Sequence, residues 1–187
     1  MTPTETAVKS AVETWKIDST HTGVEFAVKH LMISTVKGHF SDVAGELKGN
    51  INEPENFGLE VTIGTASIDT RQSQRDDHLR SADFFDAAKY PSILFKGKRI
   101  DGDVASEFKL YGDITIRDVT KELVLNVTNE GAVVDPWGGQ RIGFSAKAKI
   151  DRRDFGLTYN QALEAGGWVV GDEIKISVDV EFTAVSA

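Results

Sequence analysis

Hydrophobic and polar residues alternate with a period of two along most of this chain. In the C-terminal segment, every second residue from Ile174 to Ala184 is apolar and the residues between them are polar or charged. Successive side chains of a strand point to opposite faces, so this pattern predicts a strand with one apolar face. Alternation, as opposed to unbroken apolar runs, is typical of antiparallel sheets. The same alternation recurs in residues 24–30, 59–63, 108–116, 123–127 and 142–150.

The predicted strands are numerous and long. Turn-forming residues separate them, for example Asp101-Gly102 and the loop at 135–139, which is placed as a hairpin connection would be. We expect about eight or nine strands, the longest of about 12 residues, where ordinary strands have about 5–6. Long strands with a single apolar face leave two arrangements, a sandwich of two sheets or one sheet closed into a barrel.

One stretch, residues 71–89, lacks the period-two pattern. Ser73 followed by Asp76 has the spacing of a helix N-terminus, and Tyr90-Pro91 ends the segment. We therefore expect an insertion of one or two short helices between two strands. Nothing indicates a second domain: residues 1–13 are expected to form a flexible tail and residues 14–187 a single domain.

Composition excludes several classes of protein. The chain has 187 residues, of which 40% are hydrophobic, so it is long enough to bury its own core. It has no cysteine, which excludes thiol catalysis and disulfides. The net charge of −8, without a cationic cluster, argues against nucleic-acid binding. Because neither a leader-like start nor an apolar run of about 18 residues is present, we expect a cytoplasmic protein without stable membrane association.

The four histidines, His21, His30, His39 and His78, show no metal-binding spacing. His39 shares the parity of polar Lys37 and should face solvent. His30 instead extends an apolar strand face, where it is a hydrogen-bonded core residue, a polar ligand contact inside a barrel or a metal ligand. We expect no metal site, and no nucleophile motif or paired general acid and base is evident.

A basic group in the predicted insertion has two interpretations. Arg71, Arg75, Arg80 and His78 either lie on a solvated helix and pair with nearby aspartates, or form a basic collar at a pocket mouth that meets an anionic head group. Phe84 and Phe85 follow them, and either ring is suited to plug or line such a mouth.

Several strings of this sequence, in order and with matching gaps from about residue 14 to 185, match one known family. They include WKID at 15–18, HTGVEF at 21–26, VKHLM at 28–32, GHF at 38–40, SIDT at 67–70, DHLRSADFFD at 77–86, YP at 90–91, LYGDITIRDVT at 110–120 and IDRRDFGL at 150–157. Together these strings resemble the YceI-like family of lipocalin-like proteins.

The resemblance implies an all-β fold, an extended eight-stranded antiparallel lipocalin-like β-barrel with the helical insertion at about residues 71–89. It also implies a long apolar tunnel for a polyisoprenoid, such as a prenyl pyrophosphate or an isoprenoid quinone, and a homodimer. It implies no established catalytic activity and no required cofactor other than a bound isoprenoid lipid. The alternation itself leaves open whether the barrel is hollow, because an eight-stranded barrel can equally be filled by its own side chains.

The leading hypothesis is a binding or carrier protein that holds an isoprenoid or other long-chain lipid. Two alternatives remain: an enzyme that acts on the lipid head group through His30, and a structural dimer with a filled interior. From parity and the resemblance together, the residues expected around the ligand are Phe26, Val28, His30, Phe40, Val61, Ile63, Phe95, Leu110, Ile114 and Phe144.

Overall fold

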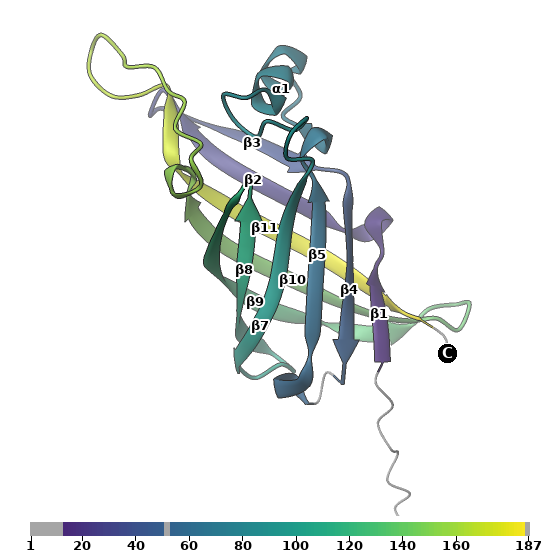
Figure 1. Ribbon diagram of the computed structural model, residues 1–187. Coiled ribbons are helices and arrows are strands. Elements are labelled where there is room, and N and C mark those ends of the chain that lie inside the picture. The colour runs from purple at the N-terminus through teal and green to yellow at the C-terminus, as the bar shows by residue number, and fades with distance from the viewer. Residues whose placement is uncertain (1–12, 51–52, 186–187) are drawn as a thin grey trace, which may run out of the picture.

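The fold is an antiparallel sheet that closes on itself (Figure 1). The computed structural model describes residues 13–50 and 53–185. Its elements in chain order are β1 (Glu13–Ile17), the 3₁₀ turn η1 (Ser19–His21), β2 (Gly23–His30), β3 (Ser34–Phe40), β4 (Val43–Gly49), η2 (Pro54–Asn56), β5 (Gly58–Gly64), η3 (Thr65–Ser67), β6 (Ile68–Asp69), α1 (Ser73–Arg80), β7 (Ser92–Gly102), β8 (Glu107–Ile116), β9 (Val119–Val134), β10 (Gln140–Asp151), η4 (Arg152–Phe155) and β11 (Val170–Ala184).

These strand segments form a closed eight-stranded barrel. The hydrogen-bonded order runs β1-β4-β5-β7-β8-β9-β10-β11-β2-β3-β6, and a further pairing of β1 with β11 closes the sheet. Three barrel strands are each interrupted once, so that β1 and β2, β3 and β4, and β5 and β6 are halves of one strand. Of the last pair, β5 also pairs with β7, whereas β6 pairs only with β3 among the described strands. The predicted antiparallel barrel is therefore confirmed, and closure leaves no long edge to aggregate.

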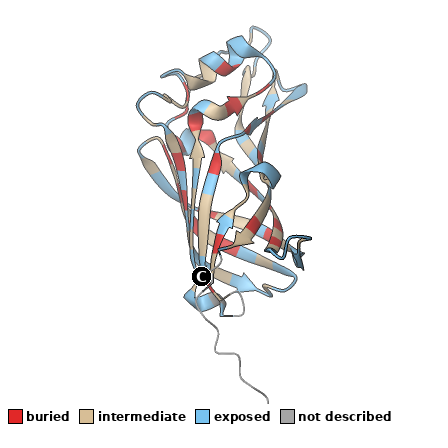
Figure 2. Cartoon of the chain, turned by 90° about the vertical axis from the view of Figure 1, so that its right-hand side faces the viewer, coloured by how far each residue is buried: buried red, intermediate tan, exposed pale blue. Residues whose placement is uncertain are grey.

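The register brings the apolar residues of neighbouring strands to one face. Ala146 of β10 lies opposite Val178 of β11 and Val127 of β9. Residues directly opposite each other share a face of the sheet, so these side chains all point into the barrel. Buried and exposed residues accordingly alternate along the strands (Figure 2).

Gly38 shows how closely the inner face is packed near β2. Gly38 of β3 lies opposite Phe26 of β2. A Cβ atom at Gly38 would lie 2.4 Å from Cζ of Phe26 and 2.8 Å from Cγ2 of Thr70. The missing side chain lets the Phe26 ring lie across β3, where it packs against Phe40 with ring centroids 5.7 Å apart.

The helical insertion caps one end of the barrel, which we call the α1 end (Figure 1). It contains one α-helix, fastened by polar bonds: the buried carboxylate of Asp76 accepts hydrogen bonds from the amide (2.9 Å) and the hydroxyl (2.5 Å) of Thr70. Arg80 donates to the carbonyl oxygens of Ala66 and Ile68 at 2.8 Å. The turn η2 lies at the opposite end, which we call the η2 end.

Of the predicted N-terminal tail, residues 1–12 lie outside the described residues, and β1 already begins at Glu13. Within the described ranges, no helix has both the length and the apolar character needed to cross a membrane.

Candidate functional site: the barrel cavity

The inner faces of the strands enclose a cavity of about 290 Å³. It extends from Phe84 and Leu157 at the α1 end to Phe57 and Val104 at the η2 end. Along β8 it is lined from Phe108 to Ile116, a length of about 27 Å at the rise of a strand. The volume lies near the lower end of the range for small-molecule sites, about 300–1,000 Å³. The side chains of the barrel therefore leave a continuous hollow, unlike the filled interior of the structural-dimer hypothesis.

The wall of this cavity is almost entirely apolar. Among the described residues that line it, only Thr22, Glu25, Asn50 and Arg152 have polar side chains, and Glu25 is exposed. Many inward-facing residues, such as Val178, are only half-buried because the void leaves part of their surface uncovered. A wall of this kind suits an apolar molecule, since it offers few groups that can orient a polar one.

The structure brings nine of the ten expected ligand-contacting residues to this cavity. They come from six different strands and are Phe26, Val28, Phe40, Val61, Ile63, Phe95, Leu110, Ile114 and Phe144.

His30 is the exception, and the expectation that strand parity carries it into the cavity is corrected. His30 is half-buried and does not line the cavity. It is the last residue of β2, and the pairing register with β11 shifts between its partner Val170 and Ile174. Leu31 follows with a φ of 51°, so the chain turns away where β2 ends; Val170, directly opposite His30, lines the cavity, whereas His30 does not.

Sequence reasoning missed several residues of the wall, among them Leu79, Phe155 and Leu157, although it named Phe84 and Phe85 as rings suited to plug or line a pocket mouth. Leu79, Phe84 and Phe85 close the α1 end; Phe155 is the last residue of η4, and Leu157 follows this turn. They lie outside the regular strands, where alternation carries no information about direction. Phe85 packs edge-on against Phe40 with centroids 5.8 Å apart, so the insertion forms part of the cavity and does not merely cover it.

Arg152 is the one cationic residue among the described residues of the wall, and all of its donors are in use. Its Nε donates to the Gly171 carbonyl (2.8 Å), its Nη1 to those of Leu157 (2.6 Å) and Tyr159 (2.9 Å), and its Nη2 to that of Val170 (3.3 Å) and to the Asp172 carboxylate (3.2 Å). A guanidinium has five N–H groups, so none is left for a ligand.

The buried position of Arg152 also argues against a role in which its charge attracts an anionic ligand. Burial lowers the pKa of this guanidinium, and the negative charges of Asp172 and Asp151 act against that shift. We conclude that Arg152 ties the segment from Leu157 to Gly171 to the end of the barrel.

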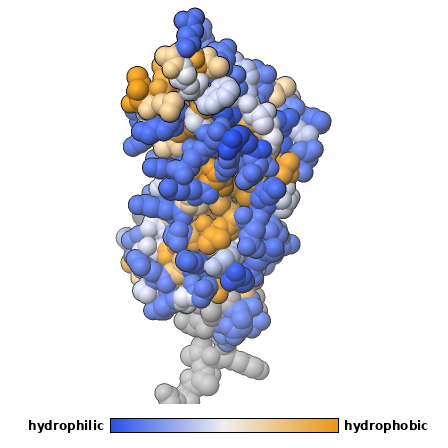
Figure 3. All heavy atoms as spheres, turned by 90° about the vertical axis from the view of Figure 1, so that its left-hand side faces the viewer, coloured by the Kyte–Doolittle hydropathy of each residue, from blue (hydrophilic) through white to orange (hydrophobic). Residues whose placement is uncertain are grey.

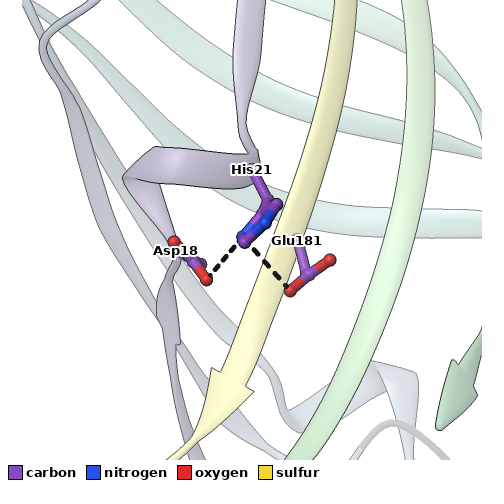
Figure 4. A group of neighbouring side chains, drawn as sticks. All are labelled: Asp18, His21 and Glu181. Carbon is purple, nitrogen blue, oxygen red and sulfur yellow. Dashed lines mark hydrogen bonds and ion pairs between the residues drawn. The ribbon is translucent and has the colours of Figure 1, made fainter. Parts of the chain in front are cut away.

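A polar cluster on the barrel wall contains one histidine and two carboxylates, those of His21, Asp18 and Glu181 (Figure 4). Their ligand atoms lie within 4.8 Å of one another, close enough to hold a cation. Arg141, however, already donates to Asp18 (2.9 Å), to Glu181 and to Asp135 (2.8 Å). Because the positive charge of Arg141 meets these carboxylates, the arrangement favours an ion-pair network over a metal site.

This network joins three distant segments: η1, the β9–β10 hairpin and β11. Hydrogen bonds from Thr20 and His21, together with Arg141, hold the pKa of Asp18 well below its ordinary 3.8. Arg141 is also the largest cause that lowers the pKa of Asp135. A carboxyl whose pKa is lowered on folding adds stability above its unfolded pKa, and that stability is lost as the pH falls through its folded pKa.

We therefore expect Arg141→Met to lower the urea midpoint of unfolding more at pH 7 than at pH 1.5, because only at such a low pH does the pH approach the lowered pKa of Asp18 in the folded protein, so that this carboxylate begins to be protonated and no longer gains from Arg141. Lys16→Met is the control, since Lys16 is 59% exposed and lies 3.8 Å from Glu46. An equal loss at both pH values would show that Arg141 acts through packing and not through these charges.

Comparison with known proteins identifies the family. A family model described as a YceI-like domain matches residues 15–182. The chain belongs to the YceI-like family.

Relatives of this YceI-like chain are similar over most of their length. A UPF0312 protein of Staphylococcus aureus strain MSSA476 is 36% identical over 167 residues, which cover 89% of this chain and 95% of the relative. The crystal structure of the Campylobacter jejuni YceI protein has a TM-score of 0.68 at 36% identity and covers 82% of this chain and 87% of that one. A polyisoprenoid binding domain from Saccharophagus degradans has a TM-score of 0.67 at 14% identity, with 91% and 98% covered, a likeness of fold alone.

The basic residues of the insertion in this YceI-like chain have mainly structural partners. Arg75 donates to the hydroxyl (2.7 Å) and the carbonyl (2.7 Å) of Thr70. Besides its hydrogen bonds to the carbonyl oxygens of Ala66 and Ile68, Arg80 forms an ion pair with Asp77, with Nη1 and Oδ1 3.1 Å apart. Nε2 of His78 lies 2.7 Å from Oδ2 of Asp83. These contacts favour the solvated helix with local ion pairs over the basic collar.

Proposed function

We propose that this barrel binds and carries a long apolar molecule, a polyisoprenoid such as a prenyl pyrophosphate or an isoprenoid quinone. The observation that carries the proposal is the continuous cavity between the two ends of the barrel, whose described wall has only four polar side chains. The fold supports it as well, because the Saccharophagus degradans structure of similar fold is named a polyisoprenoid binding domain.

The driving force of such binding is the removal of apolar surface from water. It amounts to about 25 cal/mol for each Å² buried, or about 0.8 kcal/mol for each CH₂ group. Because the wall is almost entirely apolar, the tail of the ligand sets the affinity and every isoprene unit inside the cavity adds to it.

We expect the affinity for prenols to fall by about tenfold or more with each isoprene unit removed, in a series of four, three and two units. Tenfold corresponds to about 1.4 kcal/mol, well below the full transfer energy of a unit. Titration followed by tryptophan fluorescence measures this, since Trp15 lies in the wall. Equal affinities along the series would contradict a cavity that holds the tail.

The structure does not favour the enzyme hypothesis. Its candidate residue, His30, lies outside the cavity wall, and its side chain forms no hydrogen bond or ion pair with any described residue. No other histidine is among the described residues of the wall. The homodimer and the cytoplasmic location stay predictions.

A further inference from the structure

The barrel wall parts between two strands near the α1 end. β10 pairs with β9 only from Gln140 to Lys147, opposite Val134 to Asn126. Residues 119–125 of β9 stay paired with β8, and residues 148–151 of β10 stay paired with β11. Each strand thus keeps its other neighbour, and an opening lies between these two stretches, which we call the β9–β10 window.

The cavity reaches both borders of this window. Leu123 and Leu125 of β9 and Ile150 of β10 line the cavity and belong to the two unpaired stretches. Figure 3 views the molecule from the left of Figure 1, the side on which β10 ends, and shows an apolar hollow bordered by hydrophilic residues. The backbone groups along the border lack partners from the opposite strand, so the border is polar while the interior behind it is apolar.

One lysine stands on the inner face of β9 at this window. Lys121 lies directly opposite Ile114, a buried residue of the cavity wall, so both side chains leave the sheet on the cavity side. Lys121 is nevertheless exposed and forms no hydrogen bond or ion pair with any described residue. A cation on the inner face that remains in water is what the head of an acidic lipid requires.

The remainder of the cavity offers no such group. Within the described wall, Arg152 has no free donor and Glu25 is acidic. The α1 end is closed by Phe84, which is 6% exposed and packs against Tyr159 with centroids 5.3 Å apart. A charged head inside the barrel would lose its hydration without compensation, at a cost of several kcal/mol.

We propose that the ligand enters through the β9–β10 window tail first, and that an acidic head group stays in the window in contact with Lys121. This inference rests on the proposed function, because it places the two ends of a ligand whose tail the cavity holds.

The first test compares two probes with the same tail, geranylgeranyl diphosphate and geranylgeraniol. Lys121→Gln is expected to lower the affinity for geranylgeranyl diphosphate by about tenfold and to leave the affinity for geranylgeraniol unchanged. Lys109→Gln is the matched control, since Lys109 is exposed on the outer face of the neighbouring strand, opposite Asn126. Lys109→Gln is expected to leave the affinity for both probes unchanged.

The second test closes the window. The chain has no cysteine, so thiol reagents react only at introduced positions. Continuing the register past Asn126 and Lys147 would pair Val124 with Lys149, which makes them the positions to bridge. Bridging Val124→Cys/Lys149→Cys with a bismaleimide is expected to slow release of geranylgeraniol by about tenfold or more. Bridging Thr128→Cys/Ser145→Cys, where the strands are paired, should not change that rate.

The outcomes separate this inference from the function on which it rests. Suppose that prenols bind the wild type with an affinity that depends on tail length, that Lys121→Gln lowers the affinity for both probes equally or for neither, and that the bridge leaves the release rate unchanged. The proposed entry through the β9–β10 window is then overturned, while the proposed carrier function stands. If neither probe binds the wild type, both proposals are overturned.

Discussion

Replacing Arg152 by methionine is expected to lower the free energy of unfolding by about 3–5 kcal/mol, the cost of breaking a buried charged network. The guanidinium is only 4% exposed and satisfies four carbonyl groups and one carboxylate. Methionine can occupy a similar volume but removes all five hydrogen bonds; the Val170 carbonyl then keeps only its bond from Asn160, and the Asp172 carboxylate only its pairing with Arg153. Urea unfolding at pH 7, followed by circular dichroism, measures the loss.

The neighbouring arginine provides the matched control. Arg153 has a 57% exposed side chain and pairs with Asp151 and Asp172 at the surface. Arg153→Met is expected to leave the urea midpoint of unfolding almost unchanged, because exposed ion pairs add little stability. If both variants lost the same stability, Arg152 would not be the tie that holds the segment 157–171.

Filling the cavity is expected to abolish ligand binding while the barrel stays folded. Val178 lies on β11, lines the cavity and is half-buried, so it faces open space into which a larger ring can extend. Val178→Trp is expected to lower the affinity for geranylgeraniol by about 100-fold or more, because the indole ring occupies the volume that the tail needs. Titration with the prenol measures the loss, and circular dichroism verifies the fold.

The control for this variant lies one residue earlier on the same strand. Ser177 has the opposite parity and points to the outer face, opposite Lys147 of β10. Ser177→Trp adds the same ring outside the barrel and should leave the affinity within about twofold. Retention of full affinity by Val178→Trp would show that the tail does not occupy the cavity at this level.

Local alternation was enough to predict strands at residues 24–30, 59–63, 108–116, 123–127, 142–150 and 174–184, because neighbouring side chains of a half-buried strand alternate between the core and the solvent; β1, β4 and β7 were not marked in this way. Ile174 to Ala184 became β11, and parity along β2, β5, β8 and β10 identified residues that now line one cavity. The loss of alternation after residue 71 likewise marked the segment that contains α1. These features depend on neighbours in sequence, which the pattern records.

Features that depend on how distant strands meet could not be predicted in this way. His30 fits the parity of β2, yet it is the last residue of that strand and lies outside the cavity wall. The hollow depends on the summed volumes of side chains from all the strands, and the window on the divergence of β9 and β10. The sequence does indicate that Lys121 lies on the inner face, since it shares the parity of Leu123 and Leu125. Only the β9–β10 window, which the sequence does not show, explains how a charged side chain on that face remains in water.

The most direct test is native mass spectrometry of the gently purified protein, before and after organic extraction and reloading with geranylgeraniol. A barrel that houses a hydrocarbon chain predicts a one-to-one adduct that extraction removes and the prenol restores, and that Val178→Trp fails to form. A bare protein mass throughout, even with excess prenol, would contradict it.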